Sequence, residues 1–160
     1  PEARADLDRL VAADSLNAQG RYLRGLLALA ANDDSIASAD FDVLEKLDPE
    51  GLATAIGKAS LLTKHGRAAE ALPYLRRMAS LDPQPEHYAV LAETLLSLGN
   101  LSEAGETIKT GMEKYPDNAD LYFCRAKLHR DLYELDRARE DAKKALRLGI
   151  PRDKIKELKL

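Results

Sequence analysis

The stretch YAVLAETLLSLGNLSEAGETIKTGMEKYPD, residues 88–117, predicts two helices joined by a tight turn. Apolar residues recur at helical spacing over 88–95, so one face of the first helix is apolar. Gly99 ends that helix, because glycine accepts the left-handed conformation that commonly follows a helix C-terminus. Asn100 and Glu103 form the pattern of a capping box, which predicts that a second helix starts there.

The same pattern recurs along the chain with a period of 33 or 34 residues. Five alanines mark this period: Ala3, Ala37, Ala71, Ala104 and Ala138. Small residues one helix earlier keep the same spacing: Gly25, Ala59, Ala92 and Ala126. The prolines expected to stop the helices also keep this spacing: Pro49, Pro83, Pro116 and, one residue late, Pro151. A fixed period in this range predicts stacked repeats, each of which buries its apolar face against its neighbours.

These copies in phase resemble the tetratricopeptide repeat (TPR), and the resemblance covers nearly the whole chain. It implies an all-α fold, a right-handed α-solenoid of stacked antiparallel helix pairs whose concave surface is made by the first helix of each pair. Other paired-helix solenoids of similar repeat length are the alternative. Where the two helices of a pair cross, only small residues allow close approach, so Gly25 is expected to face Ala37. The equivalent expected pairs are Ala59 with Ala71, Ala92 with Ala104, and Ala126 with Ala138.

We expect the chain to form a single domain, 1–160, which the period divides into repeats. The expected parts are the second helix of a truncated repeat at 1–17, full repeats at 18–51, 52–84, 85–118 and 119–151, and a capping helix at 152–160. Helices are expected near 2–14, 18–31, 35–47, 52–64, 67–80, 85–98, 101–114, 119–132 and 135–148, with a short one after Pro151. Ile155 and Leu158 of that last helix should cover the final pair. The sequence begins inside a repeat, which indicates an excised fragment, so no compartment is assigned.

Composition and charge indicate a soluble globular chain with an acidic N-terminal part. Of the 160 residues, 45% are hydrophobic and 32% charged, and no apolar run approaches the length of a membrane span. Residues 1–50 hold eleven acids and five bases, which argues against nucleic acid as a partner there. The tail is basic, with Lys143, Lys144, Arg147, Arg152, Lys154 and Lys156. Acids are interleaved with these bases, so a solvated helix face is the expected role.

No catalytic arrangement is recognised, and neither a metal nor a cofactor is expected. The three histidines are scattered, without a second histidine or a cysteine at ligand spacing. No glycine-rich phosphate loop is present. Cys124 is the only cysteine and is interpreted as a half-buried structural thiol.

The concave groove is the surface to which the resemblance assigns binding. Its expected lining is Tyr22, Leu23, Leu26, Ile56, Ser60, Val90, Glu93, Phe123, Lys127 and Arg130. The groove begins apolar and ends with mixed charge, where Phe123 would be an aromatic anchor beside two cations. A partner segment with apolar anchors and an acidic end would suit both parts. The carboxylate clamp of chaperone adaptors in this family is absent, since its positions hold residues such as Tyr22 and Leu26.

The expected function is a non-enzymatic scaffold that binds a peptide or protein segment in this groove. The alternative is a regulatory or substrate-docking arm of a larger enzyme or secretion assembly, and a peptide-sensing regulator is a third possibility. The sequence also leaves open whether copies of the chain associate. Finally, the apolar lining could be covered by neighbouring helices or by residues outside this sequence.

Overall fold

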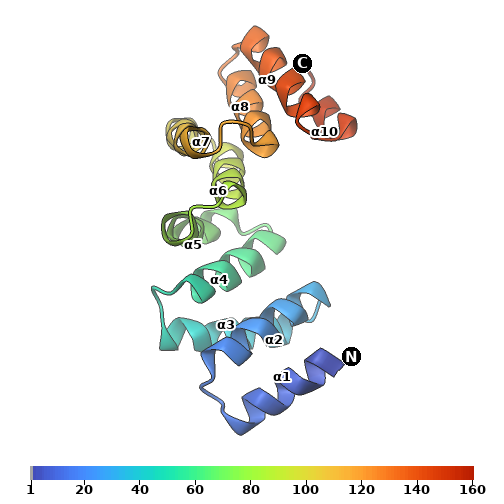
Figure 1. Cartoon of the computed structure of the whole chain (residues 1–160). Coiled ribbons are helices and arrows are strands. Elements are labelled where there is room, and N and C mark those ends of the chain that lie inside the picture. The colour runs from blue at the N-terminus through green and yellow to red at the C-terminus, as the bar shows by residue number, and fades with distance from the viewer. Residues whose placement is uncertain (1) are drawn as a thin grey trace. The chain divides into compact units, whose positions relative to one another are not determined.

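The computed structural model describes residues 2–160, and within them the secondary structure is entirely helical (Figure 1). The chain forms two compact units, of which the first ends at Leu81 and the second comprises Asp82–Leu160. The first contains α1 (Glu2–Ala13), α2 (Ala18–Ala30), α3 (Asp34–Leu47), α4 (Leu52–Lys64) and α5 (Ala68–Leu81). The second contains α6 (Pro85–Ser97), α7 (Leu101–Lys114), α8 (Ala119–Asp131), α9 (Leu135–Arg147) and α10 (Arg152–Lys156). The expected helices are confirmed, because none of the nine long ones starts or ends more than one residue from its expected position.

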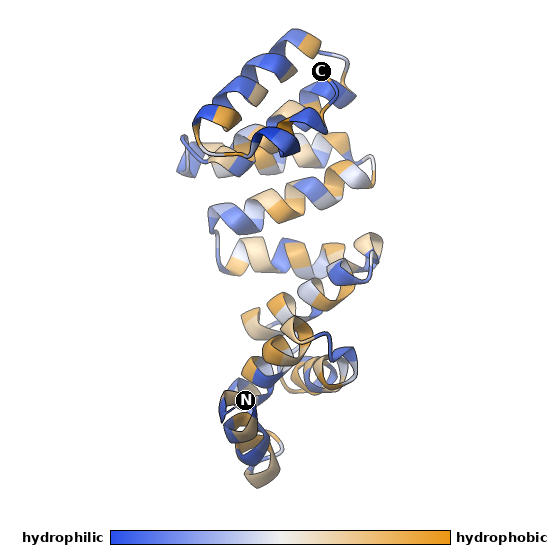
Figure 2. Ribbon diagram, turned by 90° about the vertical axis from the view of Figure 1, so that its right-hand side faces the viewer, coloured by the Kyte–Doolittle hydropathy of each residue, from blue (hydrophilic) through white to orange (hydrophobic). Residues whose placement is uncertain are grey.

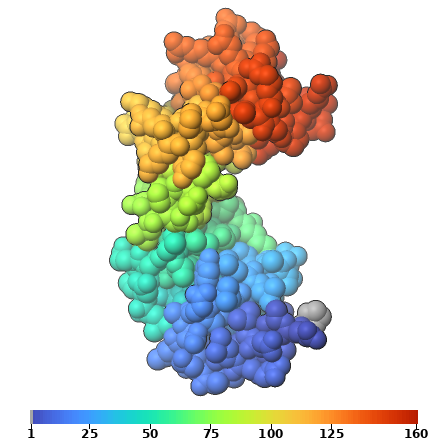
Figure 3. All heavy atoms as spheres, viewed as in Figure 1, coloured from blue at the N-terminus to red at the C-terminus, as the bar shows by residue number. Residues whose placement is uncertain are grey.

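Within the first unit, consecutive helices pair and the pairs stack. Helices α2 and α3 form one pair and α4 and α5 the next. Helix α1 packs against α2, while α4 packs against both α2 and α3. Residues of this unit, blue to green in Figure 3, lie in one close-packed body. The first helices of successive repeats, α2 and α4, are therefore direct neighbours.

The second unit repeats this arrangement. Helices α6 and α7 form a pair, as do α8 and α9, and α8 packs against both α6 and α7. The short helix α10 packs against α9. Figure 2 shows hydrophilic and hydrophobic residues mixed along the helices, as expected where one side of a helix is buried. None of the helices in residues 2–160 combines the length and the hydrophobicity needed to cross a membrane.

The same turn joins the two helices of every repeat. Its central residue has positive φ in all four copies: Asn32 at 59°, Gly66 at 69°, Gly99 at 75° and Tyr133 at 61°. The next N–H then donates to the carbonyl five residues earlier, for example from Asn100 to Leu95 at 2.9 Å. This is the Schellman geometry, which satisfies carbonyls left free at a helix C-terminus. The role predicted for Gly99 is therefore confirmed.

The capping box predicted at Asn100 is only partly correct. Helix α7 does begin at Leu101, with Asn100 at the N-cap, but the Asn100 side chain accepts no capping hydrogen bond. Asparagines cap the first helix of two repeats instead. The side chain of Asn17 accepts from the N–H of Gly20 at 2.7 Å, and that of Asn118 from the N–H of Leu121 at 3.0 Å.

The small residues at the expected helix crossings are buried, and Gly25 has a neighbour that the sequence pattern did not predict. Phe41 of α3 is fully buried and lies between two glycines of other helices. A methyl group at Gly25 of α2 would lie 2.5 Å from Cε1 of Phe41, and one at Gly57 of α4 would lie 2.5 Å from Cδ1. A side chain at Gly25 would therefore meet Phe41 first. Glycine is needed at both positions because an aromatic ring occupies the space.

We expect Gly25→Ala to lower the free energy of unfolding by about 1–3 kcal/mol, because the added methyl group overpacks the Phe41 site. Gly105→Ala is the contrasting change, since its methyl group would lie 3.5 Å from Leu128 in ordinary contact. There the gain in helix propensity should stabilise the chain by about 0.5–1 kcal/mol. Urea-unfolding midpoints followed by circular dichroism would show opposite shifts for the two variants. Equal shifts would mean that α2 and α3 do not pack as described.

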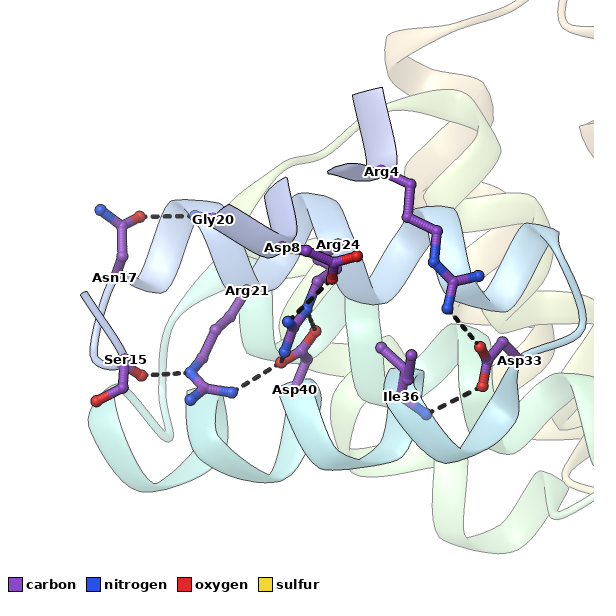
Figure 4. A network of polar contacts seen from close by, with 10 residues as sticks. All are labelled: Arg4, Asp8, Ser15, Asn17, Gly20, Arg21, Arg24, Asp33, Ile36 and Asp40. Carbon is purple, nitrogen blue, oxygen red and sulfur yellow. Dashed lines mark hydrogen bonds and ion pairs between the residues drawn. The ribbon is translucent and has the colours of Figure 1, made fainter. Parts of the chain in front are cut away.

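A buried carboxylate ties the first three helices together (Figure 4). Asp40 of α3 is 0% exposed. Both its oxygens accept hydrogen bonds from Arg24 of α2 at 2.8 Å, and Arg21 donates to Oδ1 at 2.8 Å. Arg24 also reaches Asp8 of α1 at 3.2 Å. Two guanidinium groups compensate the buried charge of Asp40.

The second unit contains an equivalent ion pair. Arg125 of α8 donates to both oxygens of Asp141 of α9, at 2.8 and 2.7 Å. In each unit the aspartate follows its arginine by 16 residues, which joins the two helices of one repeat. Two parallel hydrogen bonds fix the relative orientation of the two side chains as well as their distance.

Candidate binding surfaces

The residues expected to line the groove lie on the first helix of each pair, and each unit contributes its own surface. We call the surface of the first unit the α2/α4 face, made by Tyr22, Leu23, Leu26, Ile56 and Ser60. We call that of the second unit the α6/α8 face, made by Val90, Glu93, Phe123, Lys127 and Arg130. The two differ in charge and in how much of their apolar surface is accessible.

The α2/α4 face is apolar and partly open. Leu23 is 41% exposed, while Tyr22, Leu26 and Ile56 are half-buried. Tyr22 and Leu26 pack against the core cluster that contains Phe41. Burial raises the pKa of the Tyr22 phenol, so this side chain stays neutral at neutral pH. The face therefore presents hydrocarbon, one phenol and the hydroxyl of Ser60, without a charged group among its five residues.

A lysine closes one end of this face. The ammonium group of Lys64 donates to the carbonyl of Leu29 at 3.1 Å and to Asp34 at 2.6 Å. The last turn of α4 is thereby fixed to the end of α2 and the start of α3. The charge of Lys64 is compensated by Asp34, so it does not dominate the surface.

The α6/α8 face has mixed charge and a small hollow of about 290 Å³. Among the residues that line this hollow are Glu93, Lys127, Arg130 and Asp131. Lys127 pairs with Glu93 at 2.7 Å, and Arg130 pairs with Asp131 at 2.7 Å. The two cations expected to bind an acidic partner end are thus already paired with carboxylates of this unit. Val90, the remaining expected residue apart from Phe123, is half-buried on α6.

Phe123 is not an accessible anchor, and the sequence interpretation is wrong on this point. Its side chain is 1% exposed and belongs to a core cluster with Ala142, Ala145 and Leu158. Leu158 lies in the C-terminal segment, residues 152–160, which contains α10. That segment covers the final pair, as predicted for Ile155 and Leu158, and in doing so it buries the Phe123 ring. The ammonium groups of Lys127 and Lys154 lie 4.6 and 5.0 Å from the ring centroid.

Cys124 is a buried structural thiol. Its Sγ lies 3.6 Å from the carbonyl oxygen of Ala89, to which it donates a weak hydrogen bond. Burial, with a smaller contribution from the negative charge of Glu93, raises the pKa of the Cys124 thiol to about 12. The nucleophilic thiolate form is therefore scarce at neutral pH.

A third surface was not singled out by the sequence. A polar hollow of about 670 Å³ lies over α3, α4 and α5 of the first unit. Within it Lys58 pairs with Asp42 at 2.6 Å and Glu45 at 2.7 Å, and the Tyr74 hydroxyl donates to Glu45. Lys58, and then Tyr74, lower the pKa of Glu45. These charges neutralise one another within the hollow, so no ligand is indicated.

Histidines and carboxylates do not assemble a metal centre in the described part of the chain. Residues 2–160 contain no group of three histidine, cysteine or carboxylate side chains that could hold a metal ion. His129 lies with its Nδ1 2.6 Å from Oε2 of Glu134, which lowers the pKa of that carboxyl. This histidine serves to join the end of α8 to the start of α9.

Comparison with known proteins agrees with this arrangement of helix pairs. A family model described as tetratricopeptide repeat matches residues 62–128. Residues 62–128 are thereby identified as tetratricopeptide repeats, and solved TPR proteins share the fold of the whole chain. Proteins with this repeat are generally non-enzymatic scaffolds for protein–protein interaction, and the fold supports that general function here. Among curated proteins, none matches the sequence.

Solved TPR structures resemble this chain over almost its whole length. A tetratricopeptide repeat protein from Parabacteroides merdae shares 26% identity over 97% of the chain, with a TM-score of 0.66. The chain spans only 61% of that protein. YrrB, described as a TPR protein with an unusual peptide-binding site, shares 22% identity over 98% of the chain and 81% of its own, with a TM-score of 0.82. MamA from Desulfovibrio magneticus shares 20% identity over 92% of the chain and 84% of its own, with a TM-score of 0.81.

Proposed function

We propose that this chain binds a protein segment on the α2/α4 face of its first unit, with apolar side chains of the partner as anchors. The observation that carries this proposal is the exposure of Leu23, at 41%, beside half-buried Tyr22 and Leu26 on an uncharged face. Contiguous accessible apolar surface favours association, because burying it removes hydrocarbon from water.

The chemistry of this face selects an apolar partner segment. Tyr22 provides a large ring whose position is already fixed by packing, so little side-chain entropy is lost on binding. Ser60 supplies a hydroxyl that can pair with a backbone group of an extended or helical segment. The acidic partner end inferred from the sequence is not part of the proposal, since Lys127 and Arg130 are both paired.

One further point favours the first unit over the α6/α8 face, and another supports peptide binding by this fold in general. The aromatic ring of the α6/α8 face is buried under the C-terminal segment, so it contributes no accessible area. A protein of the same fold, YrrB, is described as having a peptide-binding site, so the fold is compatible with peptide binding.

The test is the selection of peptides from a random library on the whole chain, followed by calorimetry with the best peptide. We expect Leu23→Ser to weaken its binding about tenfold or more, because the variant loses an accessible apolar anchor. Tyr22→Ala should weaken binding at least as much. Thermal unfolding measured in parallel would show whether each variant still folds.

Leu47→Ser is the matched control, because Leu47 belongs to the same unit and is also 41% exposed. It ends α3, outside the α2/α4 face, so its replacement should leave the affinity within about twofold of the wild-type value. The proposal fails if Leu47→Ser weakens binding as much as Leu23→Ser. It also fails if only changes in the second unit reduce the affinity.

A docking arm of a larger enzyme or secretion assembly is the second candidate. The α2/α4 face would then hold a segment of the substrate or of another subunit. The same two variants, Leu23→Ser and its control Leu47→Ser, test this case when substrate affinity is measured in the complete assembly.

A further inference from the structure

The end of the second unit carries an apolar groove that neither the fold nor the proposed function explains. It has a volume of about 390 Å³ and lies between α9 and the C-terminal segment. Its floor is hydrocarbon, formed by Ala142 and Leu146 of α9 together with Ile155 and Leu160. Leu146 and Ile155 are half-buried, and Leu160 is 36% exposed.

Every ionisable side chain that lines this groove is cationic. These side chains are Arg139, Lys143, Lys156 and Lys159. Lys143 and Lys159 are exposed, and no ion pair is found for either within residues 2–160. The groove therefore combines an apolar floor with a positively charged rim.

The carboxylates nearest the other two cations compensate them only weakly. Arg139 lies 3.2 Å from Asp136, whose side chain is 99% exposed. Lys156 lies 2.8 Å from Asp153, whose side chain is 91% exposed. Exposed pairs of this kind contribute little, so both cations remain able to attract a negatively charged partner. This contrasts with the α6/α8 face, where the cations pair with partly buried carboxylates.

We infer that this groove, named here the α9/C-terminal groove, binds an amphipathic helix of a partner protein that carries glutamates or aspartates beside its apolar stripe. The apolar stripe would lie on Leu146, Ile155 and Leu160. The acidic flanks would pair with the four rim cations, which fixes the orientation of the helix and accelerates its association. This site is distinct from the α2/α4 face and does not depend on it.

An anionic membrane would also attract cations, but the position of the apolar atoms favours a protein. Proteins that lie on a membrane push their apolar side chains into the lipid. Here Ala142 is 5% exposed and the apolar side chains form the floor of a groove, with lysines at its rim. A helix can enter such a groove, whereas the surface of a bilayer cannot follow it.

The test uses a synthetic helical peptide of about 14 residues, close to the length of α9, with leucines at i, i+3, i+4 and i+7 and glutamates on both flanks. A second peptide has lysine in place of every glutamate. Fluorescence anisotropy should show binding of the acidic peptide and none of the basic one. Raising the salt from about 0.05 M to about 0.5 M should weaken binding, because the rim charges are exposed.

Lys143→Glu should reduce the affinity for the acidic peptide about fivefold, and Leu146→Ser about tenfold. Lys109→Glu is the matched control, since Lys109 is an exposed lysine of the same unit outside the groove. It should leave the affinity unchanged, as should Leu23→Ser in the first unit. If Leu23→Ser binds the acidic peptide as well as the wild-type chain does, the groove acts independently of the α2/α4 face. The inference about the groove and the proposed function can therefore fail separately.

Three outcomes would overturn the inference. The first is equal binding of the acidic and basic peptides, or no binding of either. The second is an equal effect of Lys143→Glu and Lys109→Glu, which would indicate unspecific attraction. The third is binding to vesicles that contain phosphatidylserine, lost in Lys143→Glu, without binding of the acidic peptide, which would assign the groove to a membrane surface.

Discussion

Asp40→Ala should lower the free energy of unfolding by about 3 kcal/mol, near the lower end of the effect of breaking a buried ion pair. Asp40 is fully buried, and its removal leaves the guanidinium groups of Arg21 and Arg24 without their main partner. The side chains of these arginines are 13% and 19% exposed, so water compensates each of them only partly. Urea unfolding followed by circular dichroism measures the loss.

Asp42→Ala is the control for this prediction. Asp42 lies on the same helix and pairs with Lys58 at 2.6 Å, but its side chain is 53% exposed. An exposed pair contributes about 0–1 kcal/mol, so the variant should unfold close to the wild-type midpoint. If the two aspartate variants lose the same stability, Asp40 is solvated in the native protein. The network in Figure 4 then does not stabilise the packing of the first three helices.

The positions of the helices could be predicted because backbone signals repeat with the period. The left-handed turn recurs at Asn32, Gly66, Gly99 and Tyr133, and three of these four residues are glycine or asparagine. Tyr133 shows the limit of the residue signal. Its side chain gives no indication of positive φ, and only its place in the period does.

The buried ion pairs were missed although a signal was present. Arg24 with Asp40 and Arg125 with Asp141 have the same spacing and occupy the same positions of their repeats. Charged residues are usually on the surface, so composition alone argues against burying them. Comparing the copies position by position would have shown that an arginine and an aspartate recur together.

The candidate site was predicted less well than the fold. The prediction assumed that equivalent positions on the first helix of every repeat are equally accessible. Tyr22 and Leu23 lie on an apolar face as expected, whereas Phe123 occupies the corresponding part of the last repeat and is covered. The sequence did predict that Leu158 would cover the final pair. The consequence for Phe123 depends on which side chain Leu158 meets, and repeat periodicity holds no information on that contact.

Phe123→Ala should therefore act on stability, with a loss of about 3–5 kcal/mol typical of a buried phenylalanine. The ring fills a cluster with Ala142, Ala145 and Leu158, and alanine would leave a cavity beneath the C-terminal segment. Hydrogen exchange should also become faster in residues 152–160, because their main apolar contact is lost. Denaturation midpoints and exchange rates measured on the same variant test both effects.

Tyr133→Ala is the aromatic control for this last prediction, because Tyr133 is 90% exposed. It should change the free energy of unfolding by no more than about 0.5 kcal/mol and leave exchange in the C-terminal segment unaltered. A different result for Phe123→Ala would support the interpretation drawn from the sequence. If this variant is as stable as the wild-type protein but no longer binds a peptide, the C-terminal segment opens readily in solution and the ring is an accessible anchor.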